Sequence, residues 1–252
     1  MAQGLPWGPG LTARSSVQPS ISEVTSHRKA GQAEQYALFA DIPSHDCREI
    51  LAAAQEMEYT RRQTIFLEGD LARNVILLTA GSVKNVQFGR NGTEVILRLN
   101  GPGEFVGMIG PCSRARHNSR AQTLNPSKAL VWDTPVFEGL AQRYPALRRN
   151  ASQLLCRQME EIEERFRLVS TERVSTRLSH QLIRLLSQIG RDVDGVMEIS
   201  LSREELAQLI GTTLFTVSRL LSDWDQRGIV NARREAVSVQ NLQALTAISE
   251  GE

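Results

Sequence analysis

The segment from residue 201 to residue 230 constrains the fold of this chain most, because it predicts two short helices joined by a tight turn. Ser202 and Glu205 have the spacing of a capping box, in which each side chain bonds a backbone N–H group at a helix start. Gly211 stands where glycine tolerates the left-handed conformation that ends a helix. Two apolar stripes at helical spacing flank it: Leu206, Leu209 and Ile210, then Val217, Leu220, Leu221 and Trp224.

The second predicted helix leaves polar and aromatic side chains on its outer face. Thr212 and Thr213 offer its N-cap. We expect five side chains to face outward: Thr213, Phe215, Thr216, Ser218 and Arg219. Two amphipathic helices around a glycine turn, with Ser and Arg outside, are typical of a helix-turn-helix that enters the DNA major groove. An ordinary helical hairpin buried in a helical domain is the alternative.

Composition bounds the class of protein without selecting its partner. The 252 residues suffice for roughly two domains, and the formal net charge of +1 neither supports nor excludes nucleic acid. Because no apolar run is long enough to cross a bilayer and no secretory signal is visible, we expect a cytoplasmic protein with no membrane contact. Its three cysteines lie too far apart for a zinc ribbon or a disulfide framework.

Catalytic and metal-binding patterns are missing from the sequence. There is no glycine-rich phosphate loop, no nucleophile elbow and no cluster of metal ligands, and the four histidines are scattered. We therefore expect neither a metal site nor enzymatic activity.

The N-terminal half predicts an extension followed by a small β domain. Residues 1–34 hold Gly, Pro, Ser and Gln without periodicity, which indicates a flexible extension. Within residues 35–140, short apolar or β-branched runs alternate with turn residues, and Asn91-Gly92 is a hairpin signal. This pattern favours an antiparallel β-barrel or jelly roll. The expected strands cover residues 64–67, 75–78, 82–88, 94–99 and 129–132.

Residues 141–170 predict a helix with an a/d seam. Apolar residues recur there at alternating steps of four and three: Leu155, Met159, Ile162, Phe166 and Val169. A dimerisation helix explains this seam, and a helix packed on its own barrel is the alternative. A dimer is attractive because one helix-turn-helix covers only half of a two-fold DNA site.

Residues 171–252 predict a winged helix-turn-helix domain, with the helix-turn-helix at 202–222. A helix over 174–189 and a strand over 196–199 precede it. Residues 229–230 and 237–239 would form a hairpin with Arg233 and Arg234 at its tip, where a phosphate can bind. A solvated turn explains the two arginines as well. The whole chain is thus expected to be α+β.

This order of barrel, long helix and winged helix-turn-helix resembles the Crp/Fnr superfamily of bacterial transcription regulators from about Leu38 to Leu245. NGPGEFVG at 100–107, LSREEL at 201–206 and TVSRLL at 216–221 carry the resemblance. It implies a cyclic-nucleotide-binding-like barrel and a homodimeric regulator on a two-fold symmetric operator. The implied partners are double-stranded DNA, a second copy and, as a candidate, RNA polymerase. A cyclic-nucleotide-binding regulatory subunit and a haem-based gas sensor are the alternatives.

The effector positions depart from the pattern of superfamily members that bind cyclic AMP. Those members carry Gly-Glu for the ribose and Arg-Ser for the phosphate, whereas this chain has Gly107, Met108, Asn118 and Ser119. A phosphate without its arginine loses a charge-assisted partner, and methionine accepts no bond from a ribose hydroxyl. Arg114, Arg116 and Arg120 lie close by in the sequence and could replace that arginine if the loop were rearranged, and surface solvation is the alternative role for them. We expect no cyclic AMP binding in the usual manner, and an effector that the sequence does not identify.

Neither cofactor found in other sensors of the superfamily is expected here. An iron–sulfur cluster needs about four thiolates, most of them near the N-terminus by the resemblance, and residues 1–46 contain no cysteine. Haem would have His117 and Cys112 as candidate ligands, but a loop histidine is expected to be solvated.

By resemblance, the base-reading side chains are Phe215, Ser218 and Arg219. Arg219 can bond guanine O6 and N7, whereas Phe215 replaces a glutamate common in relatives and can only pack, for instance on a thymine methyl. An inward, core position for Phe215 is the alternative. Arg203, Thr213 and Thr216 suit phosphates beside helix N-termini.

Overall fold

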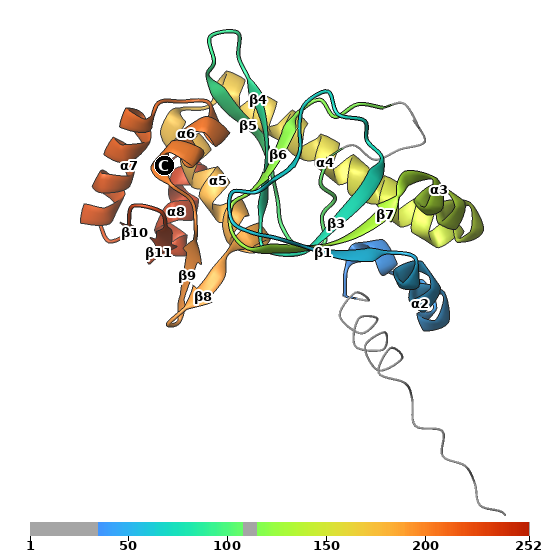
Figure 1. Cartoon of the computed structure of the whole chain (residues 1–252). Coiled ribbons are helices and arrows are strands. Elements are labelled where there is room, and N and C mark those ends of the chain that lie inside the picture. Colours follow the sequence, from blue (N-terminus) through green and yellow to red (C-terminus); the bar gives the residue numbers. More distant parts are fainter. Residues whose placement is uncertain (1–34, 108–114, 252) are drawn as a thin grey trace, which may run out of the picture.

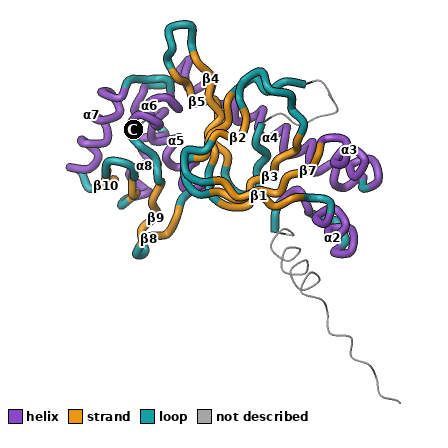
Figure 2. Tube along the Cα trace, viewed as in Figure 1, coloured by secondary structure: helices purple, strands orange, loops and turns teal. Residues whose placement is uncertain are grey.

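The computed structural model describes residues 35–107 and 115–251, so the predicted extension at 1–34 lies outside the described residues. Figure 1 shows a β domain on one side and a mainly helical C-terminal domain on the other, with the long helix α4 running along the β domain. Figure 2 shows the same division between strands and helices.

The β domain consists of two antiparallel sheets with the strand orders β1-β7-β3 and β2-β6-β4-β5. A short 3-10 helix, η1 (Ala37–Phe39), and helix α2 (Ser44–Ala52) precede them. The strands are β1 (Gln55–Tyr59), β2 (Thr64–Phe66), β3 (Asn74–Ala80), β4 (Val83–Phe88), β5 (Glu94–Asn100), β6 (Arg120–Thr123) and β7 (Ser127–Asp133). This arrangement confirms the predicted jelly-roll class. Gly92, at φ 79°, turns the hairpin between β4 and β5.

Two strands of the β domain escaped prediction, and both are mostly polar. β1 reads QEMEY and has four exposed residues, while β6 reads RAQT. Their place comes from pairing: β1 with β7, and β6 with β2 and β4. Because β-propensity depends strongly on neighbouring strands, such segments carry little signal of their own.

Helices α3 (Thr134–Arg143) and α4 (Pro145–Thr171) follow the last strand of the β domain. The two helices are separated at Tyr144, whose backbone is extended, and Pro145 then starts α4 because proline suits a first helical position. The long helix α4 therefore begins later than the predicted start at residue 141, since residues 141–143 belong to α3. Leu147, Ala151 and Leu154 bury one face of α4 on the β domain and its flanking helices.

The C-terminal domain has the predicted winged arrangement. Helix α5 spans Val174–Ile189, as expected, and is followed by β8 (Arg191–Val193), β9 (Val196–Ile199), α6 (Arg203–Ile210), α7 (Leu214–Gln226), β10 (Val230–Ala232), β11 (Val237–Val239) and α8 (Leu242–Ser249). The four strands form one sheet in the order β10-β11-β9-β8. The predicted hairpin is thus present and joined to β9. Neither β8, whose three residues are all exposed, nor α8 was predicted.

Candidate nucleic-acid interface

Local hydrogen bonds fix both ends of the turn between α6 and α7. The N–H of Glu205 donates to Ser202 Oγ at 3.2 Å, and the N–H of Ser202 donates to Glu205 Oε2 at 2.8 Å. Gly211 adopts the left-handed conformation at φ 66° and ψ 52°, and Thr213 Oγ1 accepts the N–H of Thr216 at 3.2 Å. These bonds confirm the predicted capping box, glycine turn and N-cap. They hold the start of α7 in a defined direction.

Helix α7 has one buried face and one exposed face. Val217, Leu221 and Trp224 are buried in the domain core. Phe215 precedes Val217 by two residues, which is about 200° around an α-helix, so it points away from that core. Its exposed fraction of 78% makes the alternative of an inward Phe215 wrong. Arg219 is also exposed and Ser218 is half-buried. Figure 2 shows α7 at the edge of the molecule, away from the β domain.

Most of the side chains predicted to bind phosphates have partners within the domain. Arg203 donates to the carbonyl of Ala232 at 3.3 Å and thereby connects α6 to β10. Arg233 forms an ion pair with Glu198 at 2.9 Å. Thr213 and Thr216 bond each other through their hydroxyls at 2.9 Å. Arg234 is exposed in the turn of the wing, here defined as residues 230–239.

The predicted seam of α4 is mostly open to solvent. Met159, Ile162, Phe166 and Val169 have exposed fractions of 63%, 54%, 75% and 46%, while Leu155 is half-buried. The alternative that this stripe packs on its own barrel is therefore wrong for these four exposed residues. The opposite face of α4 is the one that packs on the rest of the chain.

Aromatic rings cover the effector position at Gly107. The rings of Phe66 and His117 stack with their centroids 3.5 Å apart and an interplanar angle of 9°. A Cβ atom on Gly107 would lie 2.6 Å from Phe66 and 2.9 Å from His117. His117 is only 5% exposed, so the expectation of a solvated loop histidine is wrong. This burial lowers the pKa of His117.

The remaining predicted effector residues are not gathered into one polar site. Met108 lies outside the described residues. Asn118 is exposed, and its backbone carbonyl accepts a hydrogen bond from the side chain of Gln87. Ser119 is buried, and its Oγ accepts from Asn85 Nδ2 at 3.3 Å. Neither Asn118 nor Ser119 carries a positive charge that could pair with a phosphate near Gly107.

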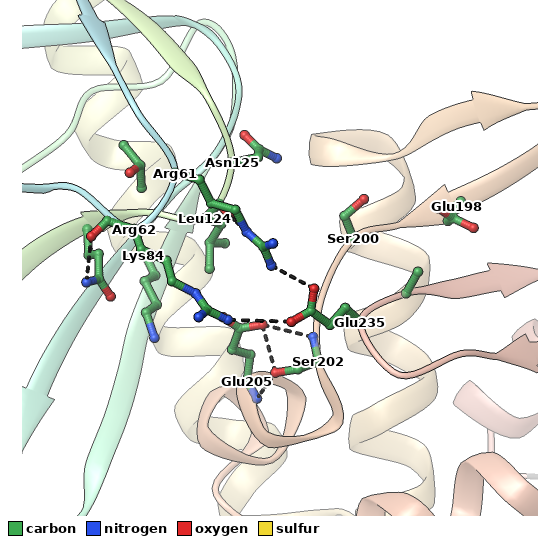
Figure 3. Close-up of a pocket in the computed structure, with 13 residues that line it drawn as sticks. Arg61, Arg62, Lys84, Leu124, Asn125, Glu198, Ser200, Ser202, Glu205 and Glu235 are labelled. Carbon is green, nitrogen blue, oxygen red and sulfur yellow. Dashed lines mark hydrogen bonds and ion pairs between the residues drawn. The ribbon is translucent and has the colours of Figure 1, made fainter.

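An ion pair connects the β domain to the wing beside a cavity of about 380 Å³ (Figure 3). Arg61, in the turn after β1, lies 2.8 Å from Glu235 in the wing turn, and Arg62 lies 3.5 Å from the same carboxylate. Arg61 Nε also donates to the carbonyl of Leu124 at 3.2 Å. Ser202 and Glu205 of the capping box face the same cavity. These contacts place the turn of the wing next to the β domain.

A second connection runs through Arg165 on α4. Its guanidinium donates to the carbonyls of Leu97, of Ile96 at 3.1 Å and of Leu209 at 2.6 Å. Burial lowers the pKa of Arg165 to about 10. Leu209 belongs to the last turn of α6, whose carbonyls favour a nearby cation. Arg165 therefore binds β5 and the helix-turn-helix at the same time.

Comparisons with known proteins decide the family. The chain matches the Cyclic nucleotide-binding domain over residues 56–144 and the Crp-like helix-turn-helix domain over residues 176–248. It is 28% identical over 214 residues to the "Cyclic AMP receptor protein" of Thermus thermophilus, covering 85% of this chain and 97% of that protein. The chain belongs to the Crp/Fnr family of transcription regulators.

One solved structure and one further relative by sequence support this placement. The structure of FixK2 from Bradyrhizobium japonicum aligns with a TM-score of 0.69 and 21% identity, over 77% of this chain and 96% of that chain. The "Anaerobic regulatory protein" of Haemophilus influenzae is 24% identical over 75% of this chain and 74% of that protein. As a Crp/Fnr member, the chain is a DNA-binding transcription regulator with a helix-turn-helix.

Two properties of the described residues of this Crp/Fnr protein concern membranes and metals. None of its described helices combines the length and the apolar character needed to span a membrane. Its described His, Cys, Asp and Glu residues form no group of three or more that could hold a metal ion.

Sequence reasoning missed Leu214, Arg165 and the Arg61–Glu235 ion pair. The spacing of Leu214 from Val217 would place it on the buried face of α7, yet it is 50% exposed. Arg165 lay among charged residues between the seam positions and carried no signal of burial. Arg61 and Glu235 are 174 residues apart, so only the fold brings them together.

Proposed function

We propose that this regulator acts as a homodimer on a two-fold symmetric DNA operator, with the start of α7 in the major groove. The exposed outer face of α7, with Phe215 at 78% and Arg219 also open to solvent, carries the proposal. The exposed stripe of α4 provides a surface for a second copy, in the manner of a two-stranded coiled coil. Two copies are needed because one helix-turn-helix covers a single half-site.

Three side chains of α7 would read bases. Arg219 would bond the O6 and N7 atoms of guanine, and Phe215 would pack on a thymine methyl where many relatives carry glutamate. Ser218 would contribute a less specific bond. Arg203, Thr213, Thr216, Arg233 and Arg234 would position the domain on phosphates. Of the three arginines in this set, Arg234 is the one best placed, because Arg203 and Arg233 already have partners in the domain.

The test is a comparison of Arg219→Ala with Arg234→Ala on operators selected from a random DNA library. We expect Arg219→Ala to lose discrimination of about 1–3 kcal/mol at one base pair per half-site. Arg234→Ala should weaken binding to all sequences alike. It should also reduce the slope of log K against log salt concentration by about one, because one phosphate contact is lost. An unchanged base preference in Arg219→Ala would refute the assignment of the reading helix.

We propose that the effector is not cyclic AMP bound in the usual manner. The phosphate-binding arginine is replaced by Asn118, and the Phe66–His117 stack covers Gly107, where a nucleotide would have to approach. Isothermal titration of the full chain with cyclic AMP should give no heat of binding at micromolar concentrations. Micromolar binding would overturn this part of the proposal.

The cysteines and His117 of this regulator do not favour a bound cofactor. We propose that the chain carries no iron–sulfur cluster, because such a cluster needs about four thiolates and this chain has three separated cysteines. Haem is not proposed either, since the ring of His117 is stacked on Phe66. A bacterial regulator works on DNA in the cytoplasm, where RNA polymerase is a candidate partner. No enzymatic activity is proposed.

A further inference from the structure

Helix α7 begins with two neighbouring large apolar side chains that are open to solvent. Leu214 is 50% exposed and Phe215 is 78% exposed. Single exposed apolar residues are ordinary on protein surfaces, but adjacent ones suggest a contact surface. These two lie on the first turn of the helix, beside the capping residue Thr213. Residues at the start of a recognition helix are those that reach base edges.

Leu214 does not belong to the core although its spacing suggests it. Val217, one turn later on the same side, is fully buried, whereas half of the Leu214 surface remains accessible. The Thr213 hydroxyl accepts the N–H of Thr216 at 3.2 Å, which fixes the backbone of this turn. The backbone that carries the two apolar side chains is therefore ordered before any ligand arrives, and little backbone entropy remains to be lost on binding.

We propose that Leu214 is a further base-reading side chain, which packs beside Phe215 on the methyl groups of thymines in the major groove. This inference rests on the proposed insertion of α7 into DNA. Thymine is the base that presents a methyl group in the major groove, and the other bases present polar edges there. An apolar side chain would leave such edges without partners, so it discriminates against them as well as favouring thymine.

The experiment replaces thymine by deoxyuracil, which removes the methyl group and keeps the base pairing. Each thymine of a selected operator is replaced in turn, and the Kd of the full chain is measured by fluorescence anisotropy. Loss of one buried methyl contact should weaken binding about fourfold at each sensitive position. Leu214→Ala should lose the sensitivity at one position, and Phe215→Ala should lose it at the neighbouring position.

Leu242→Ala provides the matched control, because Leu242 lies on α8 with a similar exposed fraction of 52%. It should keep the wild-type sensitivity to every deoxyuracil. The proposal is overturned if Leu214→Ala also keeps that sensitivity, or if the selected operator requires no thymine beside the guanine contact. If α7 does not read the DNA at all, Arg219→Ala also keeps the guanine preference of the wild type. That result distinguishes failure of the proposed function from failure of this inference alone.

Discussion

Shortening Phe166 on α4 should break the dimer without unfolding the subunit. Phe166 is the most exposed member of the seam, at 75%, and its neighbours Ile162 and Val169 are exposed on the same stripe. Its side chain therefore contributes little to packing within one subunit. In a dimer joined along this stripe, it would be buried against the same helix of the partner.

The size of the effect follows from the exposed surface. A phenylalanine buries about 150–250 Å², so three quarters of it corresponds to roughly 110–190 Å² per subunit. At about 25 cal/mol per Å², full coverage of that area contributes about 3–5 kcal/mol per side chain. If the dimer covers only half of this exposed area, the two Phe166 side chains together still contribute about 3–5 kcal/mol. We therefore expect Phe166→Ala to raise the dimer Kd at least about 100-fold.

Sedimentation equilibrium over a concentration series measures this Kd directly, and circular dichroism checks that the helix content is unchanged. Glu160→Ala is the matched control, since Glu160 is an exposed residue of the same helix beside the seam. It should leave the Kd within about threefold of wild type. A folded Phe166→Ala variant with the dimer Kd of the control would refute the seam as the interface.

Two further variants test the connections between the domains. Arg165→Met should lower the free energy of unfolding by at least about 2 kcal/mol in a denaturant titration, because buried carbonyls on β5 and α6 lose their donor; Arg157→Met, at an exposed position of the same helix, should change it little. The Arg61 side chain lowers the pKa of Glu235 below its ordinary value of 4.5. Their coupling, measured by a double-mutant cycle with Arg61→Gln and Glu235→Gln, should be present above pH 4.5 and disappear as pH falls through the lowered pKa. Coupling that persists at pH 2, or an Arg165→Met variant as stable as its control, would contradict these assignments.

The helix-turn-helix could be predicted from the sequence nearly residue by residue. Its signals are local: Ser202 and Glu205 of the capping box are only three positions apart, and Gly211 turns the chain by its own conformational freedom. The same holds for α5, whose apolar periodicity predicted both of its ends. Hydrogen bonds and side-chain stripes within one helix depend on neighbours three or four residues away, which the sequence displays directly.

The β domain was predicted less completely, because its strands depend on partners that are distant in the chain. β1 is mostly polar and becomes a strand by pairing with β7, more than sixty residues later. The Phe66–His117 stack escaped prediction for the same reason. A lone loop histidine carries no sign that an aromatic ring from another strand will cover it.

The sequence by itself determined the family pattern, the helix-turn-helix and the seam of α4, since each is written in residue types at short, regular spacings. Only the tertiary structure decided which of these side chains remain exposed and can contact DNA or a second copy. It left Phe215, Leu214 and the seam open to solvent, and it covered Gly107 with two aromatic rings. It also brought the Arg165 side chain to the Leu209 carbonyl, 44 residues away. Exposure and long-range bonding depend on how separate elements pack, and that packing has no local signature in the chain.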